Sequence, residues 1–116
     1  MELREKILLK VTELFMRYGV KSISMDDISS QLGISKKTLY QFVDNKKDLI
    51  QKVFERHIEE EMAAMKIIVN ESENAVEEIV RIAQYVTQLL REMSPKTLYD
   101  LQKYYRSIWD LSLIHI

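Results

Sequence analysis

The sequence predicts an all-α fold in which three short N-terminal helices are followed by a long helix and further helices. Only two Gly and one Pro interrupt the 116 residues, so turns are few and helices can be long. Apolar residues recur three and four positions apart through most of the chain, which is the spacing of one helix face. With 47% hydrophobic and 30% charged residues, the composition is that of a packed domain rather than a disordered chain.

The first helix is expected from Leu3 to Tyr18, and Gly19 after it suits the left-handed end of a helix. Apolar spacing places the following residues on its inner face: Ile7, Leu8, Val11, Leu14, Phe15 and Tyr18. This face should form one side of a local three-helix core.

Two short helices follow, each begun by a serine. Ser24 caps a helix whose first turn is acidic, and a carboxylate there stabilises the positive helix end. That helix must end near Gly33, and Ser35 caps a third helix with Leu39 and Val43 on one face. Two helices joined by a turn of three or four residues that contains Gly form a helix-turn-helix motif.

Three more helices are expected, from Lys46 to Val69, from Ala75 to Met93, and from Pro95 past Ile108, with Ser94 as the cap of the last. The acidic run at residues 59–61 is assigned to the solvated side of the first of them. The predicted core-facing residues are Leu49, Ile50, Val53, Phe54, His57, Ile58 and Met62, then Val76, Ile79, Val80, Ala83, Val86, Leu89 and Leu90, then Leu98, Leu101, Tyr105 and Ile108 or Trp109.

Charge is unevenly distributed along the chain. The net charge of −1 does not itself indicate a nucleic-acid partner. The first 48 residues hold nine Lys or Arg and seven Asp or Glu, a net charge of +2, whereas the rest carries −3. Four lysines lie close together in the first part: Lys36, Lys37, Lys46 and Lys47.

Several classes of protein are not expected. The absence of Cys excludes disulfides, thiolate metal sites and a cysteine nucleophile, and it fits a reducing cytoplasm. The charged N-terminus has no apolar signal core, and no apolar run approaches the ~20 residues of a membrane helix. Because no catalytic, glycine-rich phosphate or zinc spacing occurs, we expect a cytoplasmic protein that is not an enzyme and needs no cofactor or metal.

The segment from Ser24 to Leu49, SMDDISSQLGISKKTLYQFVDNKKDL, resembles the DNA-binding domain of the TetR/AcrR transcriptional repressors. The shared features are the hydroxyl residue, the Gly-x-Ser turn, Thr-Leu-Tyr and the lysine that opens the fourth helix. Leu-Phe-x-x-x-Gly, ending at Gly19, is similar to the end of the family's first helix. Ser29 replaces the family's usual Ala and Val43 its usual Phe, and each keeps a small or apolar group there.

The resemblance implies a fold, a function and partners. Residues 1–48 are expected to be the helix-turn-helix DNA-binding domain, and residues 49–110 an incomplete helical ligand-binding and dimerisation domain. The third helix would read the major groove of double-stranded DNA, and a homodimer would bind a palindromic operator. A small-molecule effector would release the repressor, and the fourth helix would transmit its effect.

The resemblance also assigns residues to DNA contact. Three residues align with base-facing positions of the family's third helix: Lys36, Lys37 and Gln41. Lys can donate to guanine, and Gln can pair with adenine. The alternative for both lysines is contact with phosphates only. Thr38 and Tyr40 align with phosphate contacts, with core packing as the alternative for Tyr40.

Two further positions combine a structural with a binding role. Ser24 caps its helix and touches a phosphate, and Lys46 meets a phosphate at the start of the fourth helix. The complete expected DNA-binding set is Ser24, Ser35, Lys36, Lys37, Thr38, Tyr40, Gln41, Phe42 and Lys46.

Other polar and aromatic groups have two interpretations each. An aromatic-rich set can line a ligand pocket or be ordinary core: Tyr85, Met93, Tyr99, Tyr104, Tyr105 and Trp109. His57 and Glu61 lie four positions apart on a helix and could chelate a metal, but interhelical packing is the better interpretation of His57.

The last residues do not continue the pattern of the preceding helix. Residues 111–116, LSLIHI, match one frame of a transposase end sequence used in sequencing adapters, so we expect a non-native tail and genuine sequence to about Asp110. The chain is then truncated before its dimerisation helices, and helices four to six should expose apolar faces.

Two functions compete. The first is a sequence-specific DNA-binding transcriptional regulator, a repressor released by a small molecule. The alternative is a helical protein–protein interaction module that does not bind DNA. Lys36, Lys37, Tyr40 and Lys46 together favour the first.

Overall fold

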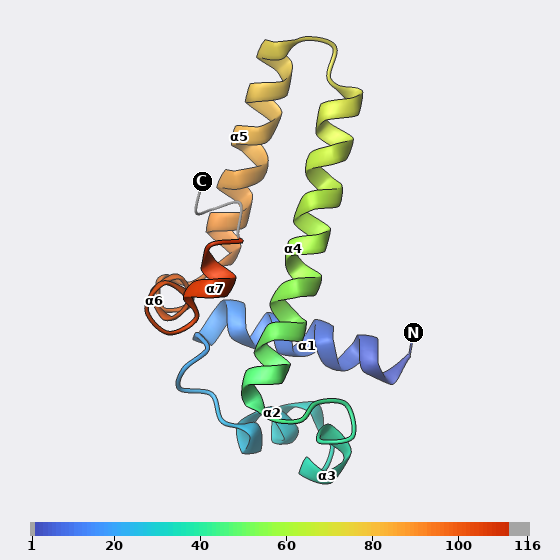
Figure 1. The fold of residues 1–116 in the computed structure, drawn as a ribbon, viewed down its shortest axis with the longest axis vertical. Helices are drawn as coiled ribbons and strands as arrows, with labels where there is room; N and C mark the ends of the chain where they lie inside the picture. Colours follow the sequence, from blue (N-terminus) through green and yellow to red (C-terminus); the bar gives the residue numbers. More distant parts are fainter. Residues whose placement is uncertain (1, 112–116) are drawn as a thin grey trace.

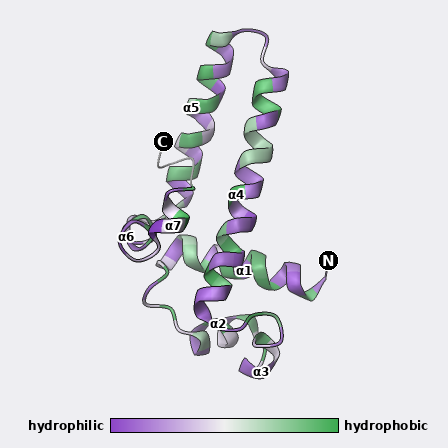
Figure 2. Ribbon diagram, in the orientation of Figure 1, coloured by the Kyte–Doolittle hydropathy of each residue, from purple (hydrophilic) through white to green (hydrophobic). Residues whose placement is uncertain are grey.

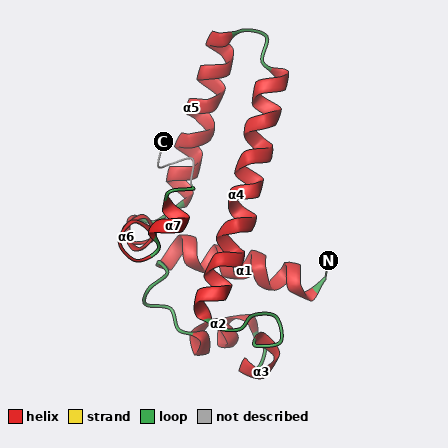
Figure 3. Ribbon diagram, viewed as in Figure 1, coloured by secondary structure: helices red, strands yellow, loops and turns green. Residues whose placement is uncertain are grey.

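The computed structural model describes residues 2–111, and over these residues the chain is all-α, as predicted (Figures 1 and 3). The expected tail lies outside the described residues except for Leu111, which is exposed. The helices are α1 (Leu3–Tyr18), α2 (Met25–Leu32), α3 (Lys36–Leu39), α4 (Lys46–Glu71), α5 (Ala75–Glu92), α6 (Pro95–Tyr104) and α7 (Arg106–Trp109).

The helices form a small head and a long arm. Helices α1, α2 and α3 gather around the first turns of α4, which then rises away from them (Figure 1). Helix α5 returns antiparallel beside α4, and α6 and α7 lie near the base of this pair, against α1 and α4 (Figure 1). The described chain extends over 51 × 32 × 21 Å, so the arm makes it elongated.

Most helices begin at a polar residue whose side chain accepts a hydrogen bond from the backbone three positions on. The Ser24 hydroxyl accepts from the Asp27 N–H at 3.0 Å, and the Asp27 carboxylate accepts from the Ser24 N–H at 2.9 Å. This reciprocal pair is a capping box, so the predicted start of the second helix is confirmed. At the other capped helices only the side chain accepts from the backbone N–H, and the capping residues are Ser35, Asn45, Asn74 and Ser94.

The turn between α2 and α3 depends on Gly33. Its φ of 70° and ψ of 28° lie in the left-handed region, where glycine has no steric penalty. Its N–H donates to the Ser30 carbonyl, and the Ile34 N–H donates to the Ser29 carbonyl at 3.1 Å. These bonds end α2 and turn the chain into α3, which confirms the predicted helix-turn-helix.

One hydrophobic core joins the head to the base of the arm. Phe15 of α1 and Phe54 of α4 stack with ring centroids 6.2 Å apart. Met93 and Leu101, from the end of α5 and from α6, are buried in the same cluster. The core therefore runs without interruption across residue 48, the expected domain boundary. Its fully buried apolar members include Val11, Phe15, Val20, Ile28, Leu39, Leu49 and Val53.

The predicted core face of α5 is wrong for most of its residues. Of the seven, only Leu89 is buried, while Val76 is 72% and Ile79 67% exposed. The hydropathy colouring shows apolar positions distributed along α5 (Figure 2). Helix α4 packs on one face of α5, and the apolar side chains on its other face stay exposed.

The prediction that residues 59–61 lie on the solvated side of α4 is wrong for Glu61. This residue is 1% exposed, because this side of α4 faces α5 rather than water. Its Oε1 lies 3.1 Å from Nε2 of His57, so the buried carboxylate has an imidazole partner one turn earlier. Periodicity failed here because Glu61 follows two exposed glutamates and reads as part of the same run.

Smaller differences concern helix ends and edges. The predicted last helix breaks at Tyr105, whose φ of −129° and ψ of 51° are not helical, so α7 is separate. Tyr18 and Met62 were expected to face the core but are 53% and 54% exposed, because each lies at the margin of its packed face. Helix α3 ends at Leu39, and i→i+3 hydrogen bonds continue the turn through Phe42.

Candidate nucleic-acid interface

Helix α3 and the turn after it present polar side chains around a buried anchor. Leu39 is fully buried, which fixes the rotation of this short helix against the core. Lys36 and Lys37, on α3, and Gln41, just after it, are exposed, and Tyr40 is 44% exposed. The residues predicted to read bases therefore lie on the solvent side of the helix-turn-helix.

Lys36 already has a partner. Its Nζ lies 2.9 Å from Oδ1 of Asp26 on α2, and both side chains are well exposed. The hydrogen bond and the charge of Asp26 raise the pKa of Lys36. Contact with DNA would require Lys36 to exchange this carboxylate for a phosphate or base, whereas Lys37 has no such competitor among the ion pairs of the described residues.

The hydroxyl residues near α3 are engaged in caps. Ser35 Oγ accepts from the Thr38 N–H at 3.1 Å and lies 2.9 Å from the Thr38 hydroxyl. Ser24 is tied into the capping box of α2. These bonds hold Ser24, Ser35 and Thr38 at the N-terminal ends of α2 and α3, where the helix dipole favours an anion.

Phe42 and Val43 follow the turn that continues α3. Val43 is 3% exposed and belongs to the core, while Phe42 is half-buried and packs against it. The apolar role expected of Val43 is confirmed by this burial. Phe42, which was predicted to contact DNA, thus packs on the hydrophobic core.

Lys46 stands at the first position of α4. Its Nζ donates to the carbonyl oxygen of Lys21 at 3.0 Å, which ties the start of α4 to the segment after α1. Burial lowers the pKa of Lys46, and the neighbouring charge of Lys21 lowers it further. The ammonium is thus held in one place beside the head rather than extended into solvent.

Sequence reasoning missed Asp100 and Thr97 of α6. Asp100 is 3% exposed and its Oδ2 accepts from the N–H groups of Val20 and Lys21, at 2.8 and 3.0 Å. The buried Thr97 hydroxyl donates to the backbone carbonyls of α1. Their common face with Leu101 was a usable signal, because positions i, i+3 and i+4 lie together on a helix.

The aromatic-rich set divides between two environments. Met93 is in the core, and Tyr105 and Trp109 pack against it, whereas Tyr99 and Tyr104 are exposed. These side chains therefore do not line one common cavity. The Tyr99 and Tyr104 rings meet edge to face with centroids 6.5 Å apart.

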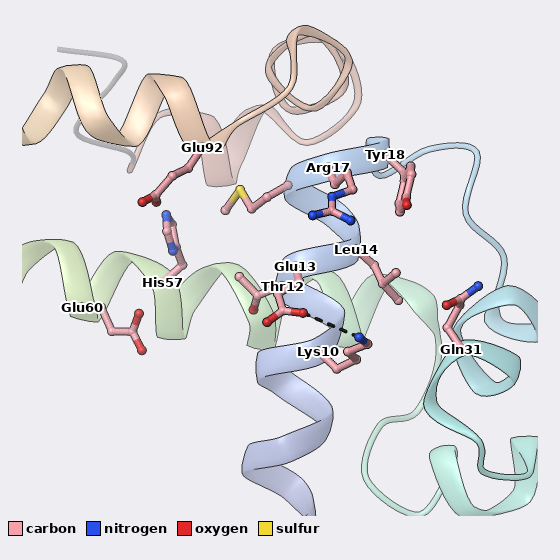
Figure 4. Close-up of a pocket in the computed structure, with 11 residues that line it drawn as sticks. Lys10, Thr12, Glu13, Leu14, Arg17, Tyr18, Gln31, His57, Glu60 and Glu92 are labelled. Atoms are coloured by element: carbon pink, nitrogen blue, oxygen red, sulfur yellow. Dashed lines mark ion pairs between the residues drawn. The ribbon is translucent and has the colours of Figure 1, made fainter.

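A cavity of about 470 Å³ lies where α1 crosses α4 beside the end of α5 (Figure 4). His57 and Glu92 extend toward one another across it from α4 and α5, and Arg17 projects from α1 (Figure 4). The lining carries both signs of charge. Within residues 2–111, no group of three or more His, Cys, Asp or Glu side chains could hold a metal ion, so His57 and Glu61 do not form part of such a group.

Hydropathy along the helices is also informative. None of the helices in the described part of the chain combines the length and the apolar character needed to cross a membrane.

The fold and the arrangement of the head have close counterparts among known proteins. Residues 7–53 match the family described as bacterial regulatory proteins, tetR family. The crystal structure of a TetR-family transcriptional regulator from Streptomyces coelicolor aligns with a TM-score of 0.76 at 20% identity, over 93% of this chain and 58% of that one. This likeness shows the fold.

Two curated relatives are similar in sequence. The HTH-type transcriptional regulator YvaF of Bacillus subtilis is 30% identical over 106 residues, which is 90% of this chain and 55% of that protein. The HTH-type transcriptional activator FasR of Mycolicibacterium smegmatis is 34% identical over 58 residues, which is 50% of this chain and 26% of that protein. The chain thus spans about half the length of the first relative and about a quarter of the length of the second.

The match of the family model to the helix-turn-helix, the sequence relatives and the shared fold agree. Residues 7–53 match the tetR family of bacterial regulatory proteins, and the chain shares its fold with a solved TetR-family regulator.

Proposed function

We propose that this chain is a DNA-binding transcription regulator whose head contacts duplex DNA through α3 and the N-terminal ends of α2 and α4. The observation that carries the proposal is the arrangement of α3: Leu39 is buried, and Lys36, Lys37, Tyr40 and Gln41 surround it on the exposed side. The names of the relatives, each a transcriptional regulator or activator, support the same function. They do not favour the alternative of an interaction module without DNA.

Within this surface we assign separate roles. Gln41 and the two lysines of α3 read base edges in the major groove, where amide and ammonium groups find matching acceptors and donors. Thr38, Tyr40 and Lys46 contact phosphates and set the register. Ser24 and Ser35 hold the N-terminal ends of α2 and α3 against the DNA backbone, and Phe42 contributes chiefly by packing against the core.

The salt dependence of binding tests this proposal. Binding of the 116-residue chain to a fluorescein-labelled duplex should weaken steeply as salt rises, because phosphate contacts release counterions. Lys46→Ala should lower the slope of log K against log salt by about 0.9, the value for one phosphate. Lys66→Ala removes an exposed lysine from the arm and should leave the slope unchanged.

Base reading has a separate test. Gln41→Ala should change the preference at one base-pair position, with about 1–3 kcal/mol of discrimination lost there. Equal loss on every sequence variant would contradict the assignment of Gln41. Salt-insensitive binding, or none, would contradict DNA binding altogether and favour the interaction module.

The partners of the complete regulator follow from the family resemblance as further proposals. We propose a homodimer on a palindromic operator, with half-sites about one helical turn or more apart, and release by a small-molecule effector. Selection of duplexes from a random pool should then recover a two-fold symmetric sequence. Recovery of a single asymmetric site would contradict the dimer while leaving DNA binding intact. A reporter driven by the recovered site decides between repression and activation.

A further inference from the structure

Helix α6 holds the segment that follows α1 through one buried carboxylate. Asp100 is 3% exposed, and a single oxygen, Oδ2, accepts from the N–H groups of both Val20 and Lys21. The residues involved lie about eighty positions apart in the sequence, so only the tertiary fold brings them together. A buried carboxylate with two backbone donors fixes the conformation of the peptide that supplies them.

The same residue, Lys21, continues the connection to the start of α4. The N–H of Lys21 is held by Asp100, and its carbonyl oxygen accepts from Lys46 Nζ at 3.0 Å. Lys46 therefore binds the carbonyl of the residue whose N–H Asp100 holds. The three residues form an unbroken chain from α6, through the segment after α1, to the first residue of α4.

The packing around this chain leaves the segment little freedom. At Gly19, with φ of 90°, a Cβ atom would lie 2.9 Å from Asp100 Oδ2 and 2.9 Å from Cγ of Lys96. On the other side, Lys96 Nζ donates to the Ser22 hydroxyl at 2.8 Å. Residues 19–22 are thus enclosed by α6 on both sides of the peptide that Asp100 holds.

We propose that Asp100 is a positioning residue for DNA binding, which acts through the Lys21 peptide to place the Lys46 ammonium where a phosphate can meet it. This inference rests on the proposed function of the head. It makes α6, as well as α4, a part of the molecule whose displacement would alter the DNA-contacting surface.

The charge of Asp100 and its positioning role predict opposite effects of its removal on DNA affinity, so an experiment can separate them. A carboxylate near the head repels phosphates, so removing its charge without a positioning role should strengthen binding to DNA. If Asp100 acts through geometry, losing the acceptor should weaken binding despite the favourable change of charge. Asp100→Ala removes both charge and acceptor, whereas Asp100→Asn removes the charge and keeps an acceptor oxygen.

The experiment measures binding of the 116-residue chain to a labelled duplex across a salt series, in a double-mutant cycle with Lys46→Ala. We expect Asp100→Ala to weaken binding about fivefold, the ratio for one ordinary hydrogen bond, and to lower the salt slope by about 0.9. Asp100→Asn should bind as the wild type does, or more tightly. In the Lys46→Ala background, Asp100→Ala should have no further effect.

Thr97→Val is the matched control. It also removes a buried hydrogen bond from α6 to α1, but Thr97 bonds to the carbonyls of Phe15 and Met16 and not to the Lys21 peptide. It should lower thermal stability and leave the affinity and the salt slope unchanged. An equal loss of affinity in Thr97→Val would show that general loosening, rather than Asp100, weakens binding, and would overturn the proposal.

The remaining outcomes are also distinguishable. Tighter binding by both Asp100 variants, or an undiminished loss in the Lys46→Ala background, would overturn this inference while the DNA-binding function stands. Wild-type binding that does not depend on salt would overturn both. If Asp100→Ala does not fold, amide hydrogen exchange of the wild type decides: the N–H groups of Val20 and Lys21 should be protected, and more weakly so in Asp100→Asn. Fast exchange at both in the wild type would also overturn the inference.

Discussion

The head and the arm are both built from amphipathic helices, yet only the head buries its apolar side chains thoroughly. In the head and the first turns of α4, Val11, Phe15, Ile28 and Leu39 are fully buried. In the arm, the strongly amphipathic α5 buries Leu89 alone. Amphipathicity therefore predicts that a helix forms and where its apolar face lies, but not what covers that face.

The two parts differ in their apolar packing and not in their ion pairs. Partly exposed ion pairs occur in both parts, such as Lys36 with Asp26 at 2.9 Å in the head and Arg81 with Glu71 at 3.6 Å in the arm. Exposed ion pairs contribute little to stability, typically below about 1 kcal/mol. We therefore expect mutations in the head core to dominate the free energy of unfolding, and four predictions test this contrast.

The largest effect is expected where α1 meets α4. Phe54→Ala removes one of two stacked rings and leaves a cavity in a core where both are almost fully buried. The free energy of unfolding should fall by about 3–5 kcal/mol, as large-to-small changes of buried aromatics do. Urea titration followed by circular dichroism measures this. A loss below about 1 kcal/mol, the size typical of a surface change, would contradict the contrast between head and arm.

The next effect concerns the two glycines with positive φ, which form a matched pair. Gly33→Ala adds only the cost of the left-handed conformation, roughly 1 kcal/mol, because nothing lies within 4 Å of the new Cβ. Gly19 is not in the left-handed region expected of it, because its φ of 90° and ψ of −178° lie in a region almost restricted to glycine. Gly19→Ala therefore strains the backbone and forces Cβ against Asp100 and Lys96 at 2.9 Å, and should cost about 2–3 kcal/mol. Thermal unfolding of both variants provides the comparison. Equal losses would mean that α6 does not enclose residue 19.

The capping box of α2 should produce a smaller, pH-dependent effect. Hydrogen bonds from the backbone and then the side chain of Ser24 lower the pKa of Asp27 from its ordinary value of 3.8. A lowered folded-state pKa contributes stability above pH 3.8, and this contribution is lost as the pH falls through the folded value. Asp27→Asn should therefore be less stable than the wild type at neutral pH and lose less stability on acidification.

Unfolding at neutral pH and at about pH 3 measures this difference. Glu59→Gln, which neutralises an exposed carboxylate on α4, is the control for the change of net charge. If Asp27→Asn lost as much stability in acid as the wild type and the control, the capping box would not contribute to the pH dependence.

The smallest effect on stability is expected on the outer face of α5. Ile79→Gln changes a side chain that is 67% exposed, so the free energy of unfolding should change by no more than about 0.5 kcal/mol. Solubility should improve, because exposed apolar patches promote association. Sedimentation and unfolding of the same variant measure both properties. A loss as large as that of Phe54→Ala would mean that the face is covered in solution.

Much of the candidate interface could be predicted from the sequence because it depends on neighbouring residues. The caps at Ser24 and Ser35 and the turn at Gly33 involve partners within five positions. Burial of Leu39 and Val43 follows from their spacing on one face. The ion pair of Lys36 with Asp26 was not predicted, since its two residues lie on different helices.

What local sequence decided is therefore where helices begin, turn and present their apolar and basic faces, because capping bonds and helical spacing operate within a few residues. The tertiary structure alone decided which faces find a cover. It buried Glu61 between α4 and α5, left Ile79 in solvent, and brought Asp100 to the Lys21 peptide. The physical reason is that desolvation and long-range hydrogen bonding depend on segments up to eighty positions apart, whose approach no local pattern records.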